Sequence, residues 1–202
     1  LKDLKKAKSY LKKTIDIQKN FGLAFFSLGN VHADLKEYND AISCYQKAIE
    51  INPRIVGAHN NMGLIYRNLN DLENAVKSYQ SAIKIQSNHA GAFHNLALAY
   101  KELGKFDESI QSHQKAIEYE PENLAHCYYL TELKKDTLNT DLKKKINKVF
   151  MNKNLTKTNS AFGNYLLAKY ERKSKNYKKE LKFLIEGHQN YFDSMKKKFE
   201  LG

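Results

Sequence analysis

A period of 34 residues runs through the middle of this chain and limits its fold more than any other feature. Small, large and apolar side chains each return at that interval, so the stretch from residue 25 to residue 121 reads as three copies of one unit. A fixed period of this length is typical of stacked helix-turn-helix units. The positions that return are Gly29, Gly63 and Ala97, then Ala41, Ala75 and Ser109, then Tyr45, Tyr79 and His113, and finally Ala48, Ala82 and Ala116.

Each position in the repeat has a physical role. A glycine or alanine lets two helices touch, and a tyrosine fills the volume between neighbouring helices. Apolar residues return at steps of three and four, as from Ala41 to Ile49, which predicts helices and no strands. Pro53 and Pro121 fall where one unit passes to the next, because proline is tolerated poorly inside a helix.

These residues resemble the tetratricopeptide repeat. The resemblance implies an all-α fold, a right-handed superhelical solenoid of antiparallel helix pairs, with a divergent helical region at the C-terminal end. We predict these segments: 1–21, the second helix of a truncated repeat; 22–55, 56–89 and 90–123, three repeats; 124–140, a degenerate repeat and a break; 141–202, a divergent, basic helical region. Because the first helix that should pair with residues 1–21 is missing from the sequence, we expect further residues upstream of Leu1.

The net charge of +12 is unevenly distributed along the 202 residues. Residues 21–122 carry nine Lys or Arg against twelve Asp or Glu, whereas residues 123–202 carry eighteen against eight. The repeats are therefore mildly acidic and the C-terminal region is strongly basic. Lysine runs at 143–145 and 196–198 suggest a nucleic-acid adaptor as one alternative function. The scarcity of arginine and the lack of a known binding motif argue against nucleic acid as a partner.

Cofactors, metals and catalysis are not indicated by the sequence. Cys44 and Cys127 lie in apolar helical patterns, which favours buried thiols over a disulfide or a metal site. No phosphate-binding loop, nucleophile signature or metal-ligand spacing is present, so we expect no catalytic residues, no cofactor and no metal. The sequence has no long apolar run and no signal peptide at its start, and we predict a cytoplasmic protein without a membrane span.

The resemblance also predicts where a ligand binds. In tetratricopeptide repeats the first helix of each unit lines the concave face. Asn61 and Asn95 lie one period apart there and resemble the asparagine ladder of O-linked N-acetylglucosamine transferases, in which amides hold a peptide backbone. We therefore predict a scaffold that binds an extended peptide or protein segment, and leave a homodimer open. The predicted binding residues are Asn30, Asn60, Asn61, Arg67, His94 and Asn95.

Two other family patterns bear on the function of the chain. Chaperone-binding repeats hold a terminal carboxylate with two amides and several cations. Asn30 and Asn61 match the amides, but Phe26, Gly91 and Asn95 stand where cations are needed, so this clamp is rejected. Residues 159–199, with Glu-Gly-His-Gln-Asn at 186–190, resemble the segment that joins repeats to the catalytic domain in bacterial tetratricopeptide–sulfotransferase fusions. The alternative is thus the non-catalytic front of a sulfotransferase, which recruits the acceptor or dimerises the enzyme.

Overall fold

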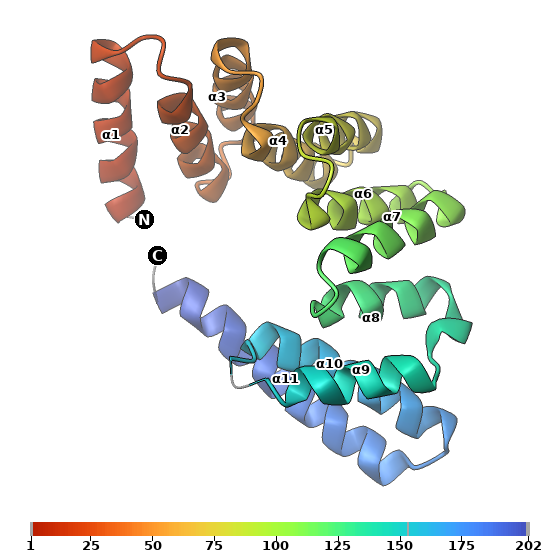
Figure 1. Cartoon of the computed structure of the whole chain (residues 1–202). Helices are drawn as coiled ribbons and strands as arrows, with labels where there is room; N and C mark the ends of the chain where they lie inside the picture. Colours follow the sequence, from red (N-terminus) through yellow and green to blue (C-terminus); the bar gives the residue numbers. More distant parts are fainter. Residues whose placement is uncertain (1, 153, 201–202) are drawn as a thin grey trace. The chain divides into compact units, whose positions relative to one another are not determined.

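The computed structural model describes residues 2–152 and 154–200. Within these residues all regular secondary structure is helical, and there are no strands. Figure 1 shows the helices as antiparallel neighbours joined by short loops. None of the described helices combines the length and apolarity needed to cross a membrane. The helices are α1 (Lys2–Ile17), α2 (Gly22–Asp34), α3 (Tyr38–Ile51), α4 (Val56–Asn68), α5 (Leu72–Ile85), α6 (Ala90–Glu102), α7 (Phe106–Tyr119), α8 (Leu124–Leu133), α9 (Thr140–Phe150), α10 (Lys157–Lys173) and α11 (Tyr177–Glu200), with a 3₁₀ turn, η1 (Lys135–Thr137).

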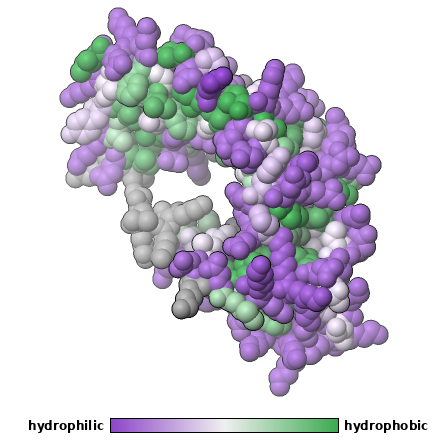
Figure 2. Space-filling model, viewed as in Figure 1, coloured by the Kyte–Doolittle hydropathy of each residue, from purple (hydrophilic) through white to green (hydrophobic). Residues whose placement is uncertain are grey.

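The chain forms two compact units that divide within α7, after Ser109, and each is described by itself. In the first unit, α2 packs against α3 and α4 packs against α5 as helix hairpins. The first helices α2, α4 and α6 also contact one another in order and form one layer, while α3 and α5 form the other. Figure 2 shows hydrophobic residues gathered over α1 to α3 among hydrophilic side chains, and Ile17 and Leu23 are exposed in this region.

A glycine against a tyrosine ring sets the spacing of both hairpins. A Cβ atom added to Gly29 would lie 2.5 Å from Cε1 of Tyr45, and one added to Gly63 would lie 2.6 Å from Cε1 of Tyr79. Both tyrosines are almost fully buried. The prediction that small residues allow close contact of the two helices is confirmed at these two positions, and the buried ring is what they make room for.

The turn inside each hairpin uses one residue in the left-handed backbone region. Lys36 and Asn70 both have φ of 61°, and Gly104 has φ of 73° at the equivalent place. Lys175, between α10 and α11, has φ of 56°, so the last hairpin turns in the same way. Left-handed backbone is unfavourable for residues with a Cβ. At the three turns with a non-glycine residue, the packing of the two connected helices therefore offsets this conformational free-energy cost.

The second unit comprises the rest of α7 together with α8 to α11. Its core includes Leu124, Ile146 and Leu166, all with no exposed surface, so α8, α9 and α10 share one apolar centre. The hairpin of α10 and α11 reverses the glycine–tyrosine arrangement: Gly187 on the second helix faces Tyr165 on the first, and an added Cβ would lie 2.6 Å from Cε1 of that ring.

A buried carboxylate replaces a small residue in this last hairpin. Glu180 stands where the repeat pattern calls for alanine, and it is 7% exposed. Its Oε1 accepts a hydrogen bond of 2.7 Å from Nε of Arg172, on the facing helix. The ion pair supplies the partner that a buried carboxylate requires, which explains how the hairpin forms despite this departure from the repeat.

Replacing Gly63 with Ala tests the glycine–tyrosine contact. Alanine in a helix interior normally stabilises by about 1 kcal/mol relative to glycine, but here the new methyl group overlaps the Tyr79 ring. We expect a net loss of about 1–3 kcal/mol in the free energy of unfolding, measured by urea denaturation. Shortening Tyr79 to Leu should remove most of that loss in a double-mutant cycle. If the two substitutions changed the free energy of unfolding additively, the proposed contact between the methyl group and the ring would be wrong.

His126 makes the second unit sensitive to acid. Burial lowers the pKa of this imidazole, and a hydrogen bond of 3.2 Å with Oε2 of Glu120 opposes part of that shift. The folded state therefore binds the proton less readily than the unfolded chain, and stability is lost as pH falls below the ordinary histidine range. We expect His126→Gln to flatten the decline in melting temperature between about pH 7 and pH 5. An unchanged slope would exclude His126 as its source.

Candidate functional site

A chain of hydrogen-bonded amides crosses the layer of first helices in the first unit. Nδ2 of Asn95 on α6 donates to Oδ1 of Asn60 on α4, at 3.0 Å. Nδ2 of Asn60 donates to Oδ1 of Asn61 at 3.3 Å, and Nδ2 of Asn61 donates to Oδ1 of Asn30 on α2 at 2.9 Å. The four amides thus connect three helices, with every donor pointing the same way.

Tyr45 anchors one end of this chain in the core. Its hydroxyl donates to Oδ1 of Asn30 at 2.8 Å, so this oxygen accepts two hydrogen bonds. Burial raises the pKa of Tyr45 to about 12, and the phenol remains a donor at neutral pH. The glycine–tyrosine contact and the amide chain are therefore physically joined through one ring.

The equivalent tyrosine of the next hairpin has no such partner. Leu64 stands where the first repeat has Asn30. Oη of Tyr79 is buried and has no hydrogen-bond partner among the described residues. The amide chain is therefore not a general property of the repeat, because it depends on asparagines that only some copies carry.

Each amide keeps hydrogen-bonding capacity for a ligand. A carboxamide carries two N–H groups and two acceptor lone pairs, and each link of the chain uses one N–H group. All four asparagines are half-buried, so their side chains are held in place and still reach the surface. Fixed amides with spare donors and acceptors are suited to binding a peptide main chain.

The other two predicted residues lie on the same helices. His94 is half-buried on α6, next to Asn95 in the sequence. Arg67 on α4 forms an ion pair with Glu102 on α6: its Nη2 and Nε donate to Oε1 at 2.7 and 3.0 Å. This guanidinium joins the same two helices as the link between Asn95 and Asn60. A ligand carboxylate would have to displace Glu102 in order to reach it.

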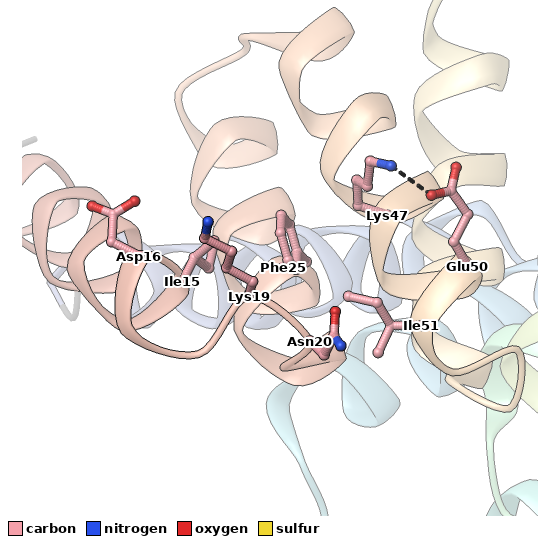
Figure 3. A pocket seen from close by; sticks show the side chains of 8 residues that line it. All are labelled: Ile15, Asp16, Lys19, Asn20, Phe25, Lys47, Glu50 and Ile51. Atoms are coloured by element: carbon pink, nitrogen blue, oxygen red, sulfur yellow. Dashed lines mark hydrogen bonds and ion pairs between the residues drawn. The ribbon is translucent and has the colours of Figure 1, made fainter.

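A large cavity of the first unit lies elsewhere. It measures about 850 Å³ between α1, α2 and α3. Figure 3 shows its mixed lining, in which Lys47 and Glu50 are paired with each other and Phe25 contributes an apolar side. None of the six predicted residues lines it. The cavity is lined by Ile15, Asp16, Lys19, Asn20, Phe25, Lys47, Glu50 and Ile51.

One cluster among the described residues has the composition of a metal site. His32, Glu37 and Asp40 place their ligand atoms within 4.8 Å of one another. Nζ of Lys8 lies 2.7 Å from Oε2 of Glu37, the same oxygen that Nδ1 of His32 contacts at 2.5 Å. The Lys8 ammonium already supplies a cation to this carboxylate and lowers its pKa. The cluster therefore works as a polar connection from α1 to α2 and α3.

Sequence reasoning named all four asparagines but missed how they are connected. It paired Asn61 with Asn95, one period apart, whereas the structure links Asn95 to Asn60 and Asn61 to Asn30. The missed signal was the spacing of Asn30 and Asn61. These two residues are 31 positions apart, about one helical turn less than the repeat period, whereas Asn60 and Asn95 are 35 positions apart.

Comparison with known proteins agrees with this architecture. Three sequence profiles of the tetratricopeptide repeat match the chain, at residues 22–55 and 90–123, at 44–77 and at 63–104. This chain contains tetratricopeptide repeats. No curated protein matches the chain.

Solved structures show the same helical solenoid fold. MamA 41-end from Desulfovibrio magneticus RS-1 aligns with a TM-score of 0.62 at 22% identity, over 73% of this chain and 84% of its own. A crystal structure of MamA aligns with a TM-score of 0.58 at 16% identity, over 96% and 92%. The first tetratricopeptide domain of Spaghetti (RPAP3), bound to the HSP90 peptide SRMEEVD, aligns with a TM-score of 0.55 at 21% identity, over 58% and 94%.

Removing the hydroxyl groups of Tyr45 and Tyr79 separately tests the anchor of the amide chain. Tyr45→Phe deletes a hydrogen bond and should lower the free energy of unfolding by about 1 kcal/mol. Tyr79→Phe deletes a buried hydroxyl without a partner and should be neutral or stabilising. Thermal and urea denaturation of the two variants provide the measurement. Equal effects of the two substitutions would show that the bond to Asn30 contributes nothing.

Proposed function

We propose that the chain is a protein-interaction scaffold whose first unit holds an extended peptide against α2, α4 and α6. The observation that carries this proposal is the unbroken amide chain from Asn95 to Asn30. Four half-buried asparagines in hydrogen-bond contact across three helices form a continuous polar strip. A strip of this kind matches an extended main chain, which presents N–H and C=O groups at regular intervals.

The amides recognise the main chain of the ligand. Asn61 and Asn95 each donate to a ligand C=O and accept from a ligand N–H, while Asn60 and Asn30 hold them in position. Because their own hydrogen bonds already fix these side chains, little rotamer freedom is lost when the peptide binds. Such a site selects for extended backbone more than for particular side chains.

A peptide complex of a related fold supports this assignment. The Spaghetti (RPAP3) domain is solved with a peptide bound, and the same fold recurs here. The mode of binding proposed for this chain differs from a carboxylate clamp, because the amides act without the cations that a terminal carboxylate needs. The front of a sulfotransferase and a nucleic-acid adaptor stay sequence predictions, and no observation above favours either over a peptide-binding scaffold.

The test uses a peptide selected from a random library against the whole chain. We expect the double variant Asn61→Ala, Asn95→Ala to bind that peptide about tenfold or more weakly, since two hydrogen-bonded contacts of about 1 kcal/mol each are lost. Asn68→Ala is the matched control, because Asn68 is an exposed asparagine at the end of α4 and outside the amide chain.

A second measurement separates main-chain from side-chain recognition. The same peptide with N-methyl groups on alternate backbone nitrogens should lose affinity, because the methyl groups remove the N–H donors that the asparagines accept. Circular dichroism checks that the double variant remains folded. Unchanged affinity of a folded double variant would refute the proposal.

A further inference from the structure

An aromatic pocket lies in the second unit, apart from the amide chain. It has a volume of about 410 Å³ and is lined by residues of α8, α10 and α11. Six of its seven lining residues have rings, and no carboxylate is among them. The lining residues are Tyr128, Tyr129, Phe162, Tyr165, Leu184, His188 and Tyr191.

The rings of this pocket stand at steep angles to one another. Tyr128 and Tyr129 meet at 82° with centroids 5.5 Å apart, and Phe162 meets both Tyr165 and Tyr191 at 81°. Rings so arranged present both faces and edges to the space between them. An apolar or aromatic side chain that enters can therefore make edge-to-face contacts with several walls at once.

The pocket opens in the most basic part of the chain. Residues 123–202 carry eighteen Lys or Arg against eight Asp or Glu, so this region has a net positive charge. Lys169 lies at the pocket itself, with Nζ 4.4 Å from the centroid of Tyr128, and its ammonium also contacts Glu132. Acidic groups of a ligand would be attracted here, and repelled by residues 21–122, which carry an excess of acids.

We propose that this pocket binds an apolar side chain, such as Phe, Tyr or Leu, of an acidic protein segment. The rings take the apolar anchor, and the net positive charge of residues 123–202 attracts the carboxylates on either side of it. A cationic side chain fits the charges poorly, because the lining offers no carboxylate and residues 123–202 carry a net positive charge. Charge complementarity thus selects an acidic segment from among the ligands that aromatic walls accept.

The repeat positions explain how this pocket arises. Tyr128 and Tyr129 stand one period after His94 and Asn95. Where the first unit presents an amide to the ligand backbone, the second presents a ring. The second unit therefore recognises a side chain where the first unit recognises a main chain. This inference is independent of the amide chain, and each can fail without the other.

The test measures binding to the whole chain of a fluorescent peptide with a central Phe flanked by Asp and Glu residues. Two matched peptides replace the Phe with Ala or all the carboxylates with amides. Tyr191→Ala removes a pocket wall that is 43% exposed, and Phe192→Ala is its control, since Phe192 is 61% exposed on the same helix and outside the pocket. Both side chains are exposed, so both variants are expected to fold.

We expect a tenfold or greater loss of affinity for the Ala peptide, for the amide peptide and for Tyr191→Ala, and no change for Phe192→Ala. The Asn61→Ala, Asn95→Ala variant should bind the acidic peptide as the unmodified chain does, which separates this site from the amide chain. Equal binding of the Phe and Ala peptides would overturn the proposal. So would tighter binding of a trimethyllysine peptide or of single-stranded RNA that competes at the same pocket.

Discussion

The close contact between a glycine and a buried tyrosine is the constraint on which the first unit depends. At Gly29 and Gly63 the ring of the facing helix occupies the space that a Cβ would take. This brings the two helices of each hairpin close enough to exclude water from Ala41, Ala48, Ala75 and Ala82, which have no exposed surface. The hairpins then stack through the remaining apolar faces. The left-handed turns at Lys36 and Asn70 are tolerated because this packing fixes the hairpins on either side.

The same contact connects the fold to the candidate site. The Tyr45 ring packs on Gly29 in the core, and its hydroxyl donates a hydrogen bond to Oδ1 of Asn30. From there the amide chain crosses to α4 and α6. A polar strip on the surface is thus held in register by a residue whose position is set by core packing. This arrangement is expected of a binding site that has to be ordered before its ligand arrives.

The second unit reaches a similar architecture by different means. Its last hairpin places the glycine on the second helix, at Gly187, and the tyrosine on the first, at Tyr165. An ion pair between the buried carboxylate of Glu180 and the exposed Arg172 stands in place of a small-residue contact. The rings of Tyr128 and Tyr129 stand one period after the polar side chains of His94 and Asn95. Divergence from the repeat has therefore changed the surface chemistry of the unit while its helices remain paired.

The sequence by itself determined the helical class, the repeats and the face that carries the asparagines, because helix periodicity and a period of 34 residues are properties of the chain order. Gly29 and Gly63 could be assigned to a close helix contact for the same reason. Only the tertiary structure decided that Asn30 bonds to Asn61 and Asn60 to Asn95, since such pairs depend on the angle at which neighbouring first helices cross. It also decided that Tyr128, Phe162 and Tyr191 share one pocket. They come from three helices far apart in the sequence, and no periodic pattern encodes their approach.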